Sequence, residues 1–137
     1  MKLVKPGLTQ IHNQIGREIV DSAFAVHKKL GPGLLERIYE SCFCFELADR
    51  GFQVEKQVPV PIVYKGITLE EGYRVDVLIN NLIICELKAH TPSQNQDLWK
   101  AQLLTYMKLK RINLGYLINF NVALIKNGIS RVILSHF

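Results

Sequence analysis

The order of hydrophobic patterns along the chain predicts an α/β or α+β sandwich, in which helices cover a mixed β-sheet. Three observations lead to this prediction. Apolar residues recur at helical spacing over about residues 10–50, they alternate with polar residues over about 52–79, and two later runs are apolar at nearly every position. Strands covered on both faces have such continuous runs, and helices placed between them indicate a layered fold.

The first part of the chain is expected to form two helices. The first spans about residues 10–30, and "GPG" at 31–33 ends it because glycine supports a left-handed cap and proline cannot continue the helix. The second spans about 34–50 and ends at Gly51. Their apolar residues are Ile11, Ile15, Ile19, Ala23, Val26 and Leu30 in the first, and Leu35, Ile38, Tyr39, Cys42, Phe43 and Phe45 in the second.

Strands dominate the rest of the chain. Residues 52–79 read as strand, turn at Lys65-Gly66, and strand, and Pro59 and Pro61 favour an edge position because proline donates no ladder hydrogen bond. "LIICELK" at 82–88 is expected to be covered on both faces. A helix from about Asp97, a buried strand "LGYLINF", a turn at 126–128 and a last strand "ISRVILS" complete the predicted order.

Length and composition predict a single domain over residues 1–137. No run approaches the roughly 18 apolar residues of a membrane span, and the N-terminus lacks an apolar signal core, so a cytoplasmic protein without membrane association is expected. The three cysteines do not have zinc-ligand spacing and are expected to be reduced and mostly buried. The net charge of +5 favours a polyanionic partner only weakly, since the basic residues are dispersed.

The stretch "YRVDVLINNLIICELKAH", residues 73–90, contains charged residues that an ordinary apolar hairpin excludes. Side chains alternate across a strand, so Glu86 and Lys88 share one face while Cys85 and Leu87 share the other. Whether Asp76 joins Glu86 depends on the loop between the two runs, because a shift of one residue moves every side chain to the opposite face.

A two-residue turn at Asn80-Asn81 would point Asp76 and Glu86 apart. We therefore expect a loop of three or five residues, or a bulge, with Asn81 at positive φ. The three-residue loop is expected to pair residue 76 with residue 84, which places Glu86 diagonal to Asp76 on one face. The same register assigns a set of residues to the core on the other face: Val75, Val77, Ile83, Cys85 and Leu87.

Asp76, Glu86 and Lys88 together suit a metal-dependent hydrolytic site. Two carboxylates held close together repel unless a proton or cation joins them. Mg²⁺ prefers oxygen ligands and retains water, so two carboxylates and a backbone carbonyl, that of Leu87, are sufficient ligands. A nearby lysine can position the attacking water or stabilise developing charge. The alternative is an ordinary surface ion pair, since E-x-K alone is common.

Three further polar residues lie where helices can meet this site. Glu36 is near the start of the second helix, in "GLLERIY", and Gln102 and Tyr106 share a face of the later helix, in "AQLLTY". Polar residues satisfied within the core would also explain this pattern. His90 is expected to be an exposed residue at the end of a strand, outside the site. Trp99 could stack on a base, although packing at the core or its rim is favoured.

These motifs, taken in order, resemble the PD-(D/E)xK nuclease superfamily. "GLLERIY" matches the G-x-x-E-x-x-Y signature of one of its families, "YRVDVLI…CELK" resembles the D…E-x-K core, and "AQLLTY" resembles the Q-x-x-x-Y helix motif. The similarity covers nearly the whole chain from about residue 14. It implies an α/β, restriction-endonuclease-like fold, with a central mixed β-sheet flanked by α-helices. It also implies Mg²⁺-dependent (or Mn²⁺-dependent) phosphodiester cleavage.

The resemblance also implies roles for particular residues. Asp76 and Glu86 look like the metal ligands, and Lys88 looks like the catalytic lysine. Glu36 resembles an acidic residue that reaches the metal through water or supports the site. Gln102 looks like an orienting residue with Tyr106 in support. The proline that precedes the aspartate in the superfamily's name is absent, since Val75 stands there.

Three functions follow from this reading: a metal-dependent nuclease, an inactive nucleic-acid-binding or assembly module with the same fold, and a small domain whose acidic pair binds a structural cation. The complete Asp76, Glu86 and Lys88 set favours the nuclease, because a structural cation site has no need of the lysine. Nucleic acid is the expected partner, with DNA as the first candidate. Sequence specificity at this length would need a homodimer or a protein partner.

Overall fold

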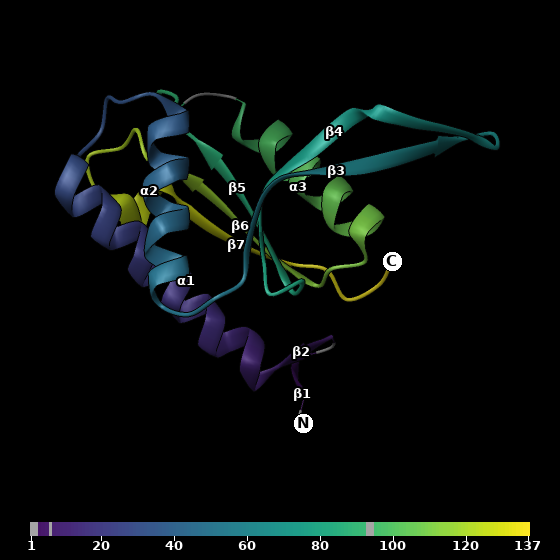
Figure 1. The fold of residues 1–137 in the computed structure, drawn as a ribbon, viewed down its shortest axis with the longest axis horizontal. Helices are drawn as coiled ribbons and strands as arrows, with labels where there is room; N and C mark the ends of the chain where they lie inside the picture. The colour runs from purple at the N-terminus through teal and green to yellow at the C-terminus, as the bar shows by residue number, and fades with distance from the viewer. Residues whose placement is uncertain (1–2, 6, 93–94) are drawn as a thin grey trace.

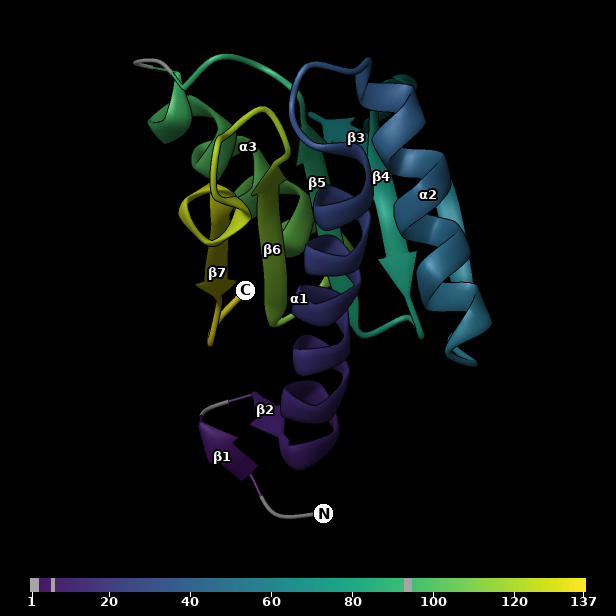
Figure 2. The same ribbon diagram turned by 90° about the vertical axis from the view of Figure 1, so that its left-hand side faces the viewer.

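Helices lie on both faces of one main β-sheet (Figures 1 and 2). The computed structural model describes residues 3–5, 7–92 and 95–137. The helices are Gln10–Leu30 (α1), Glu36–Asp49 (α2) and Gln96–Lys110 (α3). The strands are Leu3–Lys5 (β1), Leu8–Thr9 (β2), Val54–Tyr64 (β3), Ile67–Ile79 (β4), Ile83–Lys88 (β5), Leu114–Asn119 (β6) and Ile129–Ile133 (β7), with a 3₁₀ turn over Ile125–Gly128 before β7.

The main sheet is mixed and has the strand order β3-β4-β5-β6-β7. β5 and β6 are parallel, joined through α3, and the other neighbours are antiparallel. The predicted restriction-endonuclease-like α/β fold, with helices flanking a mixed sheet, is thus confirmed. The edge position of β3 agrees with its two prolines, and β5 and β6 are buried nearly throughout, as their continuous apolar runs predict.

Two hydrophobic cores lie on the two faces of this sheet. One packs under α1 and α2, where Tyr39 stacks on Phe120 with ring centroids 4.7 Å apart. The other packs under α3, around Leu103 and Met107. Gly115 lets α3 approach β6 closely, since a Cβ there would lie 2.8 Å from the Met107 sulfur. β5 contributes alternate residues to both cores and so lies at the centre of the molecule.

The burial of the two N-terminal helices differs from the predicted faces in several places. Ile11 and Ile38 are exposed, and Phe45 on α2 is 68% exposed. The residues that α2 buries are Tyr39, Phe43, Cys44 and Leu47. Cys44 and Cys85 are buried, Cys42 is half-buried and all three thiols are free, as expected. Among the described residues, no helix is long and apolar enough to cross a bilayer.

β3 and β4 form a long hairpin that projects beyond the sheet as an arm (Figure 1). Its turn at Lys65-Gly66 has two positive φ angles, 49° and 81°, and matches the predicted position. Within the arm the strands change face: Val77 packs under α1 and α2, whereas Val75 packs under α3. The prediction that both share one face was wrong. Gln57, opposite this point on β3, has φ 53°, a left-handed kink that alternation alone does not anticipate.

Candidate functional site

The β4–β5 loop brings Asp76 and Glu86 together. Ile79 pairs with Ile83, so three residues form the loop, and both Asn80 and Asn81 have positive φ. The expected three-residue loop and positive φ at Asn81 are confirmed. The predicted pairing of 76 with 84 was wrong, because residue 84 pairs with Leu78. The observed register nevertheless brings the two acids together, because it sets position 76 directly opposite position 86.

The regular ladder ends at Val77 and Cys85, and beyond it the two carboxyl groups replace backbone partners. The backbone N–H of Asp76 donates to Glu86 Oε1 at 3.1 Å, and that of Leu87 donates to Asp76 Oδ2 at 2.9 Å. Each carboxyl group thus bonds to the backbone of the opposite strand. They meet between the strands, rather than lying diagonally on one pleated face as predicted.

Glu86 is a buried acid that holds its proton. It is 4% exposed, and burial first, followed by the nearby Asp76 carboxylate, raises its pKa to about 9. At neutral pH the pair therefore carries a proton. A divalent cation between the two groups would replace that proton, because it removes the repulsion that keeps Glu86 neutral.

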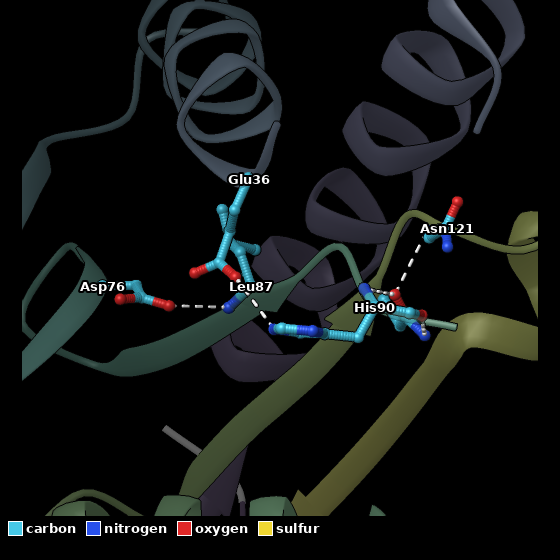
Figure 3. Close-up of polar contacts among 6 residues, drawn as sticks. Glu36, Asp76, Leu87, His90 and Asn121 are labelled. Atoms are coloured by element: carbon cyan, nitrogen blue, oxygen red, sulfur yellow. Dashed lines mark hydrogen bonds and ion pairs between the residues drawn. The ribbon is translucent and has the colours of Figure 1, made fainter. Parts of the chain in front are cut away.

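α2 adds two more acids from its first turns. Figure 3 shows the Glu36 side chain pointing from the start of α2 toward Asp76, Leu87 and His90. Burial, followed by the Asp76 charge, raises the pKa of Glu36. Glu40 accepts a 2.8 Å hydrogen bond from Gln57 Nε2, which also donates to Asp76 Oδ1 at 3.3 Å. Burial raises the pKa of Glu40 as well.

His90, which sequence reasoning placed outside the site, contacts Glu36. Its side chain is exposed, as predicted, but its Nε2 lies 3.8 Å from Glu36 Oε2 (Figure 3). Buried Asn119 fixes the backbone here: its Oδ1 accepts from the N–H of His90 at 3.2 Å, and its Nδ2 donates to the carbonyl of His90 at 2.8 Å. His90 follows Lys88 by two residues, and side chains at this spacing in an extended chain point to the same face. This spacing could have placed His90 near the site.

Glu40 and Gln57 also contact the site, although neither was among the predicted site residues. Glu40 lies one helical turn after Glu36, and this i,i+4 spacing places both acids on the same side of α2. That spacing was a usable signal. Gln57 offered none, because a glutamine on an edge strand is ordinary and its contacts depend on the kink at that residue.

α3 brings Gln102 and Tyr106 to the same region. The two side chains are hydrogen-bonded to one another, and both line a cavity of about 410 Å³ together with Lys88. Burial, then the charges of Glu86 and Asp76, raises the pKa of Tyr106 to about 12, so its hydroxyl stays protonated. All the side chains predicted for the site, namely Glu36, Asp76, Glu86, Lys88, Gln102 and Tyr106, therefore gather around one end of β5.

The donor set fits a divalent cation that keeps much of its water. Among residues 3–5, 7–92 and 95–137, no cluster of three or more His, Cys, Asp or Glu side chains could by itself enclose a metal ion. Two carboxyl groups are nevertheless in direct contact, and one is buried and protonated. Mg²⁺ is commonly bound by one or two carboxylates plus water, whereas structural zinc sites need four protein ligands.

Comparison with known proteins gives one match. The family model described as the PD-(D/E)XK nuclease superfamily matches residues 13–132, which is most of the chain. Neither the curated proteins nor the solved structures include a significant match.

Proposed function

The chain belongs to the PD-(D/E)XK nuclease superfamily, and on this premise we propose that it is a metal-dependent nuclease that hydrolyses phosphodiester bonds of nucleic acid. One observation carries the proposal. Where the β4–β5 ladder ends, the carboxyl groups of Asp76 and buried Glu86 each accept a hydrogen bond from the backbone of the opposite strand, and Lys88 follows Glu86 on β5. Residues 1–137 would act as a single domain.

Each residue has a proposed role. Asp76 and Glu86 would hold Mg²⁺ or Mn²⁺ with the backbone carbonyl of Leu87, and Glu36 would contribute through water. The bound cation would polarise a phosphoryl oxygen and lower the pKa of its water. The Lys88 ammonium would position the attacking water or stabilise the negative charge that develops on the phosphate. Gln102 orients the site, and Tyr106 supports it.

We also propose that the chain belongs to the G-x-x-E-x-x-Y family, because the structure gives a physical reason for the residue type at each of the three motif positions. Gly33 has φ 101° in the turn before α2, a conformation that favours glycine. Glu36 faces the acidic pair. Tyr39 is fully buried, and its hydroxyl donates to the carbonyl of Gly31 and accepts from the N–H of Leu34 at 3.1 Å. The tyrosine thus holds the loop that positions Glu36.

Cleavage assays test the proposal directly. Plasmid DNA, linear DNA and RNA are incubated with Mg²⁺ or Mn²⁺ and wild-type protein, Asp76→Ala or Asp49→Asn. Asp49 is an exposed acid at the end of α2, so its variant controls for loss of charge. We expect metal-dependent cleavage by wild type and Asp49→Asn only. Absence of cleavage with retained binding of nucleic acid would indicate the inactive module instead.

Metal binding has its own test. Titration calorimetry with Mn²⁺ should show weaker binding by Glu86→Gln than by wild type. Because Glu86 is protonated at pH 7, binding to wild type should also release a proton, which is measured by repeating the titration in buffers of different ionisation enthalpy. Equal affinities for the two proteins would exclude Glu86 as a ligand.

A further inference from the structure

The cavity beside Lys88 is walled by aromatic side chains. Its volume is about 410 Å³, within the range of about 300–1,000 Å³ that holds small ligands. Tyr73 reaches it from the β3–β4 arm, and Trp99, Gln102 and Tyr106 reach it from α3. Lys88 is the lining residue that belongs to β5, so the cavity borders the proposed reaction centre.

Two of the rings in this cavity, those of Tyr73 and Trp99, are held in place but keep accessible surface. Tyr106 is buried, and its ring centroid lies 5.5 Å from that of Tyr73, which is 40% exposed. Trp99 is partly buried against the core under α3 while it also lines the cavity. Its ring lies 5.6 Å from the Lys88 Nζ and 5.6 Å from the His90 ring. Trp99 thus packs at the rim of the core, as expected, and still presents part of its ring to the cavity.

This combination matches the parts of a nucleotide. Aromatic rings bind the flat face of a base by stacking, irrespective of which base it is. The Gln102 amide can both donate to and accept from a base edge. A lysine ammonium at the margin suits a phosphate of the same nucleotide. A base inside a duplex has its faces covered by its neighbours, so only an unpaired or extruded base can enter.

We propose that this cavity binds an unpaired nucleobase next to the phosphate that is cleaved, so that single-stranded nucleic acid is the preferred substrate. The expected preference for cleaving single strands rests on the proposed nuclease function. Binding of the base is independent of that function, because stacking on Tyr73 and Trp99 requires neither metal nor catalysis.

The fluorescence of Trp99 reports this binding directly, because it is the only tryptophan of the chain. The protein is titrated in EDTA with a single-stranded oligonucleotide, with the same length carrying abasic sites, and with a duplex. We expect saturable quenching by the base-containing single strand, and little by the other two. Equal quenching by the abasic strand would mean that only phosphate is recognised and would overturn the proposal.

Variants locate the binding in this cavity. Trp99→Phe keeps an aromatic ring for packing, Tyr73→Ala removes an exposed ring, and Ala101→Leu fills the cavity from an exposed position on α3. Binding is followed by the anisotropy of a labelled single strand. One stacking contact is worth about 1–3 kcal/mol, so we expect Tyr73→Ala to bind about 5- to 150-fold more weakly. Ala101→Leu should weaken binding without affecting the core.

Phe45→Ala is the matched control, because Phe45 is an exposed aromatic residue on α2, outside the cavity. It should bind the single strand like wild type. Unchanged binding by both Tyr73→Ala and Ala101→Leu would overturn the proposal.

The two proposals can fail separately. Base-dependent quenching without cleavage under any metal would reject the nuclease function and leave the nucleobase cavity. Cleavage of duplex and single strand at equal rates, with Ala101→Leu as active as wild type, would reject the cavity and leave the nuclease.

Discussion

Glu86 has a raised pKa because it is buried beside another acid, and this couples the stability of the protein to pH. Its ordinary pKa of 4.5 rises to about 9 in the folded state. The folded protein therefore binds this proton more tightly than the unfolded chain does. The stabilising contribution is fully present below about pH 4.5 and is lost as the pH rises toward 9.

Glu86→Gln should stabilise the metal-free protein at pH 8. Glutamine keeps the shape and hydrogen-bonding capacity of the protonated acid, and the variant does not need the proton that wild type, ionised when unfolded at pH 8, must take up on folding. Because each unit of pKa shift corresponds to about 1.4 kcal/mol, we expect a gain on the order of a few kcal/mol. Thermal unfolding in EDTA measures the effect. The difference between the two melting temperatures should shrink toward pH 5, because the unfolded wild-type chain itself begins to bind the proton near the ordinary pKa of 4.5. A variant less stable than wild type at both pH values would show that Glu86 is held as a carboxylate.

Lys88 is expected to serve the reaction and not the cation. Lys88→Ala should reduce cleavage about 100- to 1,000-fold, since removing one donor to developing charge typically has that effect, while Mn²⁺ affinity stays nearly unchanged. Lys108→Ala, at an exposed position near the end of α3, is the control. If metal affinity fell as far as activity, Lys88 would instead organise the site, and an unchanged rate would exclude the proposed mechanism.

The turn before α2 is the element that sets the position of Glu36. The α2 N-cap, Leu35, offers no side-chain cap, so the turn depends on the two hydrogen bonds of the Tyr39 hydroxyl. Tyr39→Phe retains the ring stack on Phe120 but removes both bonds. We expect about 1–3 kcal/mol of destabilisation and slower cleavage.

Chemical denaturation and cleavage rates of Tyr39→Phe check this expectation, with Tyr64→Phe on the exposed arm as the control. Normal cleavage by a destabilised Tyr39→Phe would show that the turn holds Glu36 without the tyrosine hydroxyl.

Periodicity was sufficient to predict the helices and the buried strands, because each follows from local spacing of apolar residues. The parity of the β4–β5 loop was predicted instead from the requirement that Asp76 and Glu86 share a face. It was insufficient where the backbone departs from regular geometry. Val75 and Val77 lie in different cores at the level where Gln57 on the neighbouring strand has a left-handed φ, and the regular ladder ends where the carboxyl groups of Asp76 and Glu86 bond to the backbone. The contact of His90 with Glu36 depends on elements far apart in the sequence, so a pattern within one strand could not establish it.

The short β1–β2 hairpin was also missed. Its strands have three and two residues, too short for alternation to be recognised. Elements of this length are defined by their pairing partner, which sequence periodicity does not reveal.

The two hydrophobic cores share one sheet, and this bears on whether the chain unfolds as one unit. β5 places Cys85 and Leu87 in the core under α1 and α2, and Ile84 in the core under α3. Loss of either core would therefore expose one face of the same central strand. We infer that residues 1–137 form a single cooperative domain, because neither helical layer can retain its packing without β5.

Two core substitutions test this cooperativity. Phe43→Ala removes packing under α2, and Leu103→Ala removes packing under α3; each should cost about 2–5 kcal/mol. Unfolding in urea is followed by Trp99 fluorescence, which reports on the α3 side, and by far-ultraviolet circular dichroism, which reports on all the helices. Both signals should shift together in each variant, because one transition removes both cores. If Phe43→Ala moved the circular dichroism midpoint and left the fluorescence midpoint in place, the layers would unfold independently.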